Sequence, residues 1–147
     1  MNIVYMLMAA CAGSFIALQA SANASLRHRL NDPWYAAFFS ICGTITTAVI
    51  LMLIFRPSPP STEAIRSAPW WNWIGGPLGV MIVLAGATLA PKLGAAAFIS
   101  SVVGGQLICS LVLDHFGLME LPQQGITLGR LVGALFVVLG VGMIKYL

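Results

Sequence analysis

The sequence contains very little charge. Asp, Glu, Lys and Arg make up 7% of its 147 residues, and only four of these side chains are acidic. Soluble domains carry about 25% charged residues, so the composition excludes an ordinary soluble globular protein. The chain is instead 59% hydrophobic, with a mean hydropathy of +0.94. Such values are typical of an integral membrane protein, most of whose surface faces lipid.

Cysteine is also scarce, and its spacing excludes two kinds of site. Cys11, Cys42 and Cys109 each lie in an apolar stretch, without CxxC or Cys/His spacing. We therefore expect no disulfide framework and no metal site. The chain also lacks a Ser/His/Asp set, a phosphate-binding loop and a basic cluster with interleaved aromatic residues. We expect no enzymatic activity, no cofactor and no nucleic-acid partner.

Long apolar runs separate the few charges. A helix that crosses the roughly 30 Å hydrocarbon core of a bilayer needs about 20 residues. The sequence predicts an all-α integral membrane protein, a single membrane domain over residues 1–147. Its five transmembrane helices are expected at about residues 3–23, 34–55, 70–90, 95–114 and 128–146.

Capping residues mark several of the predicted helix starts. Asp32 followed by Pro33 is typical of an N-cap and a first-turn proline, and Pro69 is expected to open the third helix in the same way. Thr127 is a candidate N-cap for the fifth helix.

Prolines also mark predicted helix ends. Pro57 and Pro91 are expected to follow the second and third helices, since proline cannot continue a helix. The Pro- and Ser-rich segment 56–66 is predicted to be a flexible connector.

The first apolar run has an alternative interpretation. Residues 22–24 (Ala-Asn-Ala) resemble a signal-peptide cleavage site. However, no Lys or Arg precedes the run, and Arg27 and Arg29 come after it. We expect this run to be retained as a transmembrane helix.

The basic residues barely favour one membrane orientation. With the N-terminus outside, the cytoplasmic side would hold Arg27, Arg29, Lys92 and Lys145, and the outer side Arg56, Arg66 and Arg130. The positive-inside rule then gives almost no bias. Two interpretations stay open. Either the first loop sets a single orientation, or the chain inserts both ways and two oppositely oriented copies pair, as in inverted-repeat transporters.

Two polar stripes run along the apolar helices. Gln106, Ser110 and Asp114 are four residues apart and share one helix face, and Gln19 and Asn23 repeat this spacing. A carboxamide in hydrocarbon needs a partner, either on another helix or in a polar cavity. A serine can bond a carbonyl one turn back. The Asp114 carboxylate lies at the predicted end of the fourth helix, where it could simply be solvated.

Aromatic residues and glycines supply further candidates. Trp71 and Trp73 lie in a cluster typical of an interfacial belt, although an inward-facing member could stack on a ligand together with Phe39. Small residues let membrane helices approach closely. The candidates for helix packing or a dimer seam are Gly75, Gly79, Gly104, Gly105, Gly129 and Gly133.

Three segments resemble a known family. They are LQASANASLRHRLNDPWYAAFFSICGT (18–44), WWNWIGGPLGVMIVLAGATLAPKLGAAAFISSVVGGQLICSLVLDHFGL (70–118) and RLVGALFVVLGV (130–141). Together they resemble the YdcZ-like five-helix branch of the drug/metabolite transporter superfamily. The resemblance implies half of an inverted-repeat transporter in the bacterial inner membrane. It also implies an antiparallel dimer, either a homodimer or a heterodimer with a related chain.

One departure from the superfamily affects the expected mechanism. Its four-helix exporters carry a membrane-centred glutamate on their first helix, whereas CAGSFIAL (11–18) has no acidic residue. Their proton/drug antiport mechanism therefore does not transfer to this chain.

These observations predict a small-molecule transporter, most simply an exporter. The candidate substrate-binding residues are Gln19, Asn23, Phe39, Trp71, Trp73, Gln106 and Ser110. Asp114 is the candidate proton carrier or the charge at the cavity mouth. In an antiparallel pair it would reach the face of Gln19 and Asn23 of the other copy. Two alternatives are a flippase for a lipid-linked substrate and a non-transporting membrane partner subunit.

Overall fold

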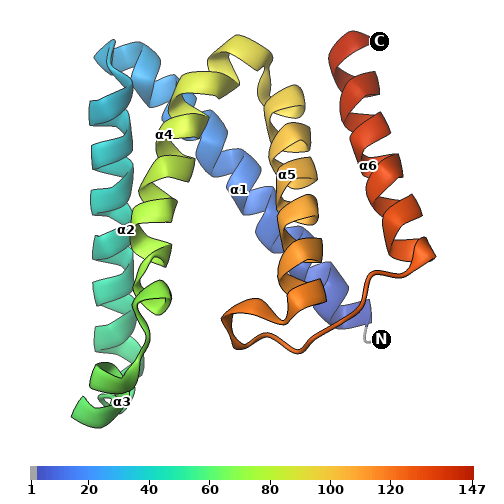
Figure 1. Cartoon of the computed structure of the whole chain (residues 1–147). Helices are drawn as coiled ribbons and strands as arrows, with labels where there is room; N and C mark the ends of the chain where they lie inside the picture. The colour runs from blue at the N-terminus through green and yellow to red at the C-terminus, as the bar shows by residue number, and fades with distance from the viewer. Residues whose placement is uncertain (1–2) are drawn as a thin grey trace. The chain divides into compact units, whose positions relative to one another are not determined.

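The computed structural model describes residues 3–147 and is all-helical over that range (Figure 1). Within the described range, five helical segments are long and apolar enough to cross a membrane, which confirms the predicted fold class. The helices that form these segments are α1 (Ile3–Leu30), α2 (Pro33–Phe55), α4 (Gly75–Leu93), α5 (Ala95–Phe116) and α6 (Leu128–Tyr146).

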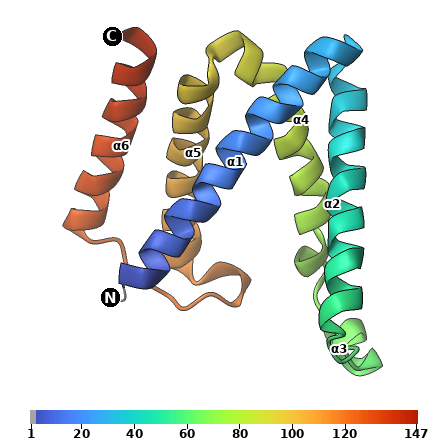
Figure 2. The same ribbon diagram turned by 180° about the vertical axis from the view of Figure 1, so that it is seen from behind.

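The chain forms two compact units. The first ends at Thr88 and contains α1, α2, α3 (Thr62–Ser67), the short 3₁₀ helix η1 (Trp70–Trp73) and most of α4. Within it, α1 packs against α2, and α4 lies beside α2 in both views (Figures 1 and 2). The second unit, Leu89–Leu147, contains the end of α4, then α5, the 3₁₀ helix η2 (Leu118–Glu120) and α6. In this unit α5 packs against α6.

The turn between α1 and α2 is capped as predicted. Asp32 Oδ1 accepts hydrogen bonds from the backbone N–H groups of Trp34 (2.7 Å) and Tyr35 (3.1 Å), and Pro33 occupies the first helical position. However, α1 extends to Leu30, seven residues beyond the predicted end at Asn23. The basic residues 27–29 of its last turn favour this extension, because cations stabilise the negative end of a helix. Asn23 therefore lies inside the helix and not at its end.

The third spanning helix differs from its predicted range at both ends. Trp70–Trp73 form η1 with Pro69 as its N-cap, so α4 begins only at Gly75. Pro91 lies inside α4, which corrects the expectation that it follows the helix. A proline removes one N–H donor, but the helix closes beyond it, where Gly94 N–H donates to the Ala90 carbonyl at 2.9 Å.

The predicted flexible connector is partly helical, which corrects that expectation. Ser61 Oγ accepts a hydrogen bond from Ala64 N–H at 3.1 Å and so caps α3. A single N-cap hydrogen bond stabilises a short helix. The Pro- and Ser-rich composition of the segment does not indicate this helix. The other predicted ends are confirmed: Pro57 follows α2, whose C-cap Arg56 is left-handed (φ 44°), and Thr127 caps α6 by accepting from Arg130 N–H at 3.3 Å.

Small residues form the contacts between helices. Ala20, Ala36 and Ala37 are buried in the first unit, and Gly104 of α5 is buried in the second. A Cβ at Gly104 would lie 3.5 Å from Val141 Cγ2 of α6. Most large apolar side chains are exposed instead, for example Phe55 and Leu131. This distribution suits helices that pack closely on one another while their outer surfaces face lipid.

Candidate functional site

Hydroxyl and carboxamide side chains differ sharply in the first unit. Thr44, Thr46 and Thr47 each donate to the carbonyl four residues earlier in α2, at 2.8–3.1 Å. Such bonds satisfy hydroxyl groups inside apolar helices. The Gln19 carboxamide, by contrast, makes no hydrogen bond within residues 3–147. In an apolar medium it therefore requires a partner from outside this part of the chain.

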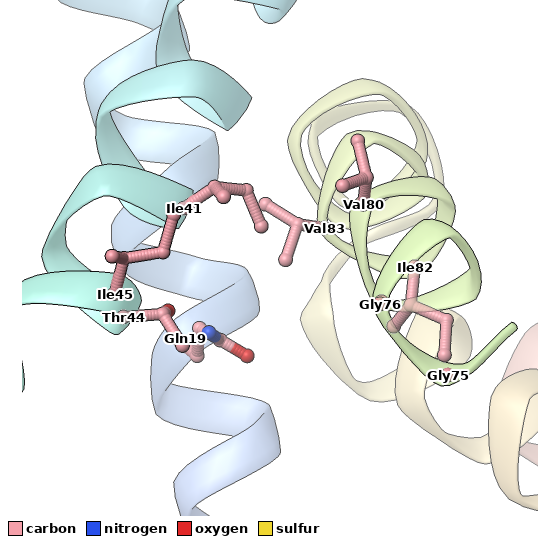
Figure 3. A pocket seen from close by; sticks show the side chains of 10 residues that line it. Gln19, Ile41, Thr44, Ile45, Gly75, Gly76, Val80, Ile82 and Val83 are labelled. Carbon is pink, nitrogen blue, oxygen red and sulfur yellow. The ribbon is translucent and has the colours of Figure 1, made fainter. Parts of the chain in front are cut away.

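Gln19 lies on a cavity of about 510 Å³ in the first unit. The cavity is bounded by α1, α2 and α4, and its lining residues are Gln19, Ile41, Thr44, Ile45, Gly75, Gly76, Gly79, Val80, Ile82 and Val83. Figure 3 shows the Gln19 amide pointing from α1 toward α4, while Ile41 and Val83 point toward one another. Three helices thus place one carboxamide in an otherwise largely aliphatic space of the size of a ligand site.

Glycines form much of the α4 side of this cavity. A Cβ built at Gly75, Gly76 or Gly79 would meet no atom of the described chain within 4 Å. The absent side chains therefore leave volume to the cavity and do not serve a helix contact inside this unit. A role for Gly75 and Gly79 in a dimer seam stays a prediction.

Asn23 follows Gln19 by one helical turn but does not line this cavity. Its side chain is only 5% exposed, and Nδ2 finds no acceptor among the described residues. A buried N–H without an acceptor is costly. The same face of α1 thus carries two carboxamides that find no hydrogen-bond partner among residues 3–147.

The three aromatic candidates lie away from the Gln19 cavity. Phe39 is more than half exposed and packs edge-on against Phe38, with ring centroids 5.7 Å apart. Trp71 packs edge-on against Trp70, and its buried Nε1 lacks an acceptor in the part of the chain described. Trp73 is largely exposed and lines a separate hollow of about 260 Å³ beside α3. The structure therefore does not bring these rings to Gln19.

The stripe on α5 contains one free carboxamide and one satisfied hydroxyl. Gln106 is exposed, and its amide makes no hydrogen bond in the described range. Ser110 Oγ donates to the Leu107 carbonyl at 2.9 Å. Of these two side chains, only Gln106 still requires a partner.

Asp114, at the end of the same stripe, forms an ion pair. Its Oδ2 lies 3.3 Å from Arg130 Nη1 of α6, and both side chains are about a third exposed. Arg130 also donates to the Gln124 backbone carbonyl (3.4 Å) and side-chain oxygen, and Gln124 N–H donates to the Asp114 carbonyl (2.7 Å). The carboxylate thus ties the end of α5 to the start of α6.

His115 strengthens this connection. Its carbonyl accepts from Gln123 Nε2 at 2.9 Å, and its Nδ1 accepts from Ile126 N–H at 3.4 Å. The roles of Arg130 and Gln124 were not predicted from the sequence. A signal existed, because a short loop places the first turn of the fifth helix beside the last turn of the fourth.

The remaining glycines differ in their surroundings. Gly104 lies in the α5–α6 contact, whereas a Cβ at Gly105, Gly129 or Gly133 would meet no described atom within 4 Å. These three positions are open in the single chain.

Within residues 3–147, five apolar helical segments long enough to span a membrane define a multi-pass membrane protein. Residues 4–143 match the family described as "Putative inner membrane exporter, YdcZ", and the chain belongs to this family. The resemblance seen in the sequence is thereby confirmed, and the protein is a multi-pass inner-membrane protein. No curated protein and no solved structure matches the chain.

Proposed function

We propose that this protein exports a small molecule across the inner membrane and that the Gln19 cavity holds the molecule during transport. The cavity is the observation that carries the proposal. It combines a volume of about 510 Å³ with a carboxamide that has no partner inside the described chain. Binding sites of this kind are mostly apolar, with a few polar groups that orient the ligand.

The proposed working unit is an antiparallel dimer, either of this chain or with a related one. Three observations support it: the nearly even charge distribution, the open glycines on α5 and α6, and the lack of a hydrogen bond to the Gln106 amide within residues 3–147. In an antiparallel pair, the α5 stripe of one copy would come to the face of Gln19 and Asn23 of the other. The carboxamides would then line a shared polar path.

Asp114 is the proposed charge at the mouth of this path and the candidate proton carrier. Its ion pair with Arg130 adds a condition to the second role. A proton could reach the carboxylate only by weakening that pair. Proton binding would then also loosen the connection between α5 and α6.

A flippase for a lipid-linked substrate is the second candidate function. Ile45 and Ile82 of the cavity are 59% and 52% exposed, so the cavity opens onto an apolar surface of the first unit. An acyl or prenyl chain could lie along such a surface. Transport by a flippase would require that chain.

Comparing culture media tests the export proposal. Cells would express the wild-type protein, Gln19→Leu or the control Leu18→Ala. Leu18 is the neighbour of Gln19 in the sequence, but its side chain is 66% exposed and does not line the cavity. We expect mass spectrometry to find a compound enriched in the medium and depleted in the cells with the wild type and Leu18→Ala, but not with Gln19→Leu.

Three results would change this conclusion. A wild-type medium identical to that of cells without the protein would contradict export and favour a non-transporting partner subunit. Export that is unchanged in Gln19→Leu would remove Gln19 from the path. A transported compound that always carries a long acyl or prenyl tail would favour the flippase.

A further inference from the structure

Among residues 3–147, no charged side chain lines the Gln19 cavity. Its ten residues are aliphatic residues, glycines, Gln19 and Thr44. The helices themselves continue this pattern, because no Asp, Glu, Lys or Arg occurs in residues 3–26, 33–55 or 75–91. A cation in this cavity would lose its hydration without gaining a free counter-charge, because the carboxylate proposed for the mouth of the path, Asp114, is already paired with Arg130. Such a loss is strongly unfavourable in a low-dielectric site.

Aromatic rings do not compensate for the missing counter-charge. None of the described residues that line the cavity is Phe, Tyr or Trp. Cation–π attraction, which lets uncharged sites bind quaternary cations, requires a ring face within about 6 Å of the charge. The nearby aromatic candidates line other surfaces, as Trp73 does beside α3.

The polar groups of the cavity suit a single hydrogen-bonding function. With respect to the described part of the chain, the Gln19 carboxamide has both donors and its acceptor oxygen free. The Thr44 hydroxyl donates to the Ser40 carbonyl at 3.1 Å, so toward a ligand it can only accept a hydrogen bond. Figure 3 shows both side chains on the side of α1 and α2, with Gly75 and Gly76 on the α4 side. The remaining surface offers aliphatic contact and the volume left by the glycines.

We infer that this cavity selects an electrically neutral, largely apolar molecule with one hydrogen-bonding group, and that it excludes cations. The inference rests on the proposed function, since it names the class of molecule carried at the same site. The hydrogen-bonding group of the cargo pairs with the Gln19 carboxamide. The apolar body fills the space between Ile41 of α2 and the glycines of α4.

Binding of matched probes to the purified protein tests this inference. The protein would be placed in phosphatidylcholine nanodiscs, and empty nanodiscs would measure partition into lipid. Triphenylphosphine oxide is neutral and has one strong acceptor, and triphenylmethane is neutral without one. Tetraphenylphosphonium is a cation with one phenyl ring more, and its binding to Gln19→Glu shows whether its size fits. We expect saturable binding of the oxide, about fivefold weaker binding of triphenylmethane, and no saturable binding of the cation.

Substitutions at Gln19 test the hydrogen bond and the charge separately. Gln19→Leu is expected to weaken binding of the oxide about fivefold and to leave triphenylmethane unchanged. Gln19→Glu preserves the shape and adds a carboxylate. It should therefore create saturable binding of tetraphenylphosphonium, a gain that a structural defect cannot produce.

Substitutions at a glycine test the location. Gly76→Leu is expected to fill the cavity and to abolish binding of the oxide, while Gly76→Ala adds one methyl group and should reduce it only partly. Gly13→Leu is the matched control, because Gly13 on α1 also has no described atom within 4 Å of its Cβ and does not line the cavity. Size-exclusion chromatography and circular dichroism would confirm that each variant is folded.

Several results would overturn the inference. Saturable binding of tetraphenylphosphonium to the wild type as tight as that of the oxide would contradict selection against charge. Oxide binding that survives Gly76→Leu would place the site elsewhere. Phospholipid that co-purifies with the wild type and is lost in Gly76→Leu, with no binding of either neutral probe, would show that an acyl chain occupies the cavity.

The two proposals fail in distinguishable ways. If Gln19-dependent export is found but the cation binds preferentially, only the inference of a neutral cargo is wrong. If no Gln19-dependent export is found, the proposed function itself is wrong, whichever probe binds.

Discussion

At the scale of single residues, the ion pair between Asp114 and Arg130 is oriented against the helices that carry it. Asp114 lies in the last turn of α5 and Arg130 in the first turn of α6. The partial charge of a helix is negative at its C-terminus and positive at its N-terminus. Each side chain is therefore at the unfavourable end of its helix, and the 3.3 Å pair offsets this cost.

Reversing the pair gives a prediction at this scale. We expect Asp114→Asn or Arg130→Ala alone to lower the stability by up to about 1 kcal/mol, because the pair is partly exposed. The double variant Asp114→Arg with Arg130→Asp should be at least as stable as the wild type, since both charges then suit the helix ends by about 0.3–1 kcal/mol each. Thermal unfolding in detergent measures this, and a double variant less stable than either single one would contradict it.

The same variants separate two roles of the carboxylate. If Asp114 only ties α5 to α6, the reversed pair restores Gln19-dependent export together with stability. If Asp114 carries a proton, the reversed pair restores stability but not the dependence of export on the pH gradient.

At the scale of helices, close contact depends on a few small residues. Gly104 of α5 lies against Val141 of α6, whereas a Cβ at its neighbour Gly105 would meet no described atom within 4 Å. The two glycines are adjacent in sequence but differ in surroundings because consecutive residues point in different directions around a helix. Local sequence alone cannot tell which of them contacts a partner helix.

These neighbours form a matched pair of variants. Gly104→Leu is expected to destabilise the protein by about 1–3 kcal/mol, because the atoms beyond Cβ would overlap with Val141. Gly105→Leu should leave the unfolding temperature unchanged, and it should weaken dimerisation if Gly105 belongs to the proposed seam. Circular dichroism and light scattering measure the two effects. Equal destabilisation by both variants would contradict the α5–α6 contact.

At the scale of the whole molecule, the nearly even distribution of basic residues leaves insertion direction weakly specified. An antiparallel dimer of identical chains requires both orientations. Single cysteines near the two ends of α2, one in the last turn of α1 and one in the loop after α2, can report them. The structure favours Ser58 and His28 for this purpose, because both are exposed, whereas Ser61 caps α3 and Asn31 has a φ of 54°.

Labelling of intact cells gives the prediction at this scale. Cysteine would replace Ser58 or His28 in a chain whose three native cysteines are changed to alanine. We expect an impermeant thiol reagent to label each site in about half of the molecules, as dual insertion requires. Labelling of one site only would exclude a homodimer of opposed chains and would leave an oppositely oriented related chain as the partner.

The sequence by itself determined the membrane class, the five spans and most helix ends. These features depend on local properties: the length of apolar runs, a capping carboxylate at Asp32, and the prolines around Pro57. Two predictions were wrong. Pro91 lies inside α4, because that helix tolerates a proline near its end, and segment 56–66 is partly helical, because Ser61 caps α3. The family resemblance was also evident, because it rests on the order of residues.

Only the tertiary structure decided which polar residues share a site. Gln19 meets α2 and α4 across long sequence separations, and the glycines that open the cavity contribute by lacking side chains. The pairing of Asp114 with Arg130 likewise depends on how α5 and α6 pack. The periodicity of a helix shows which residues share a face. It does not show which neighbouring helix, cavity or partner that face meets, because this depends on contacts between distant parts of the chain.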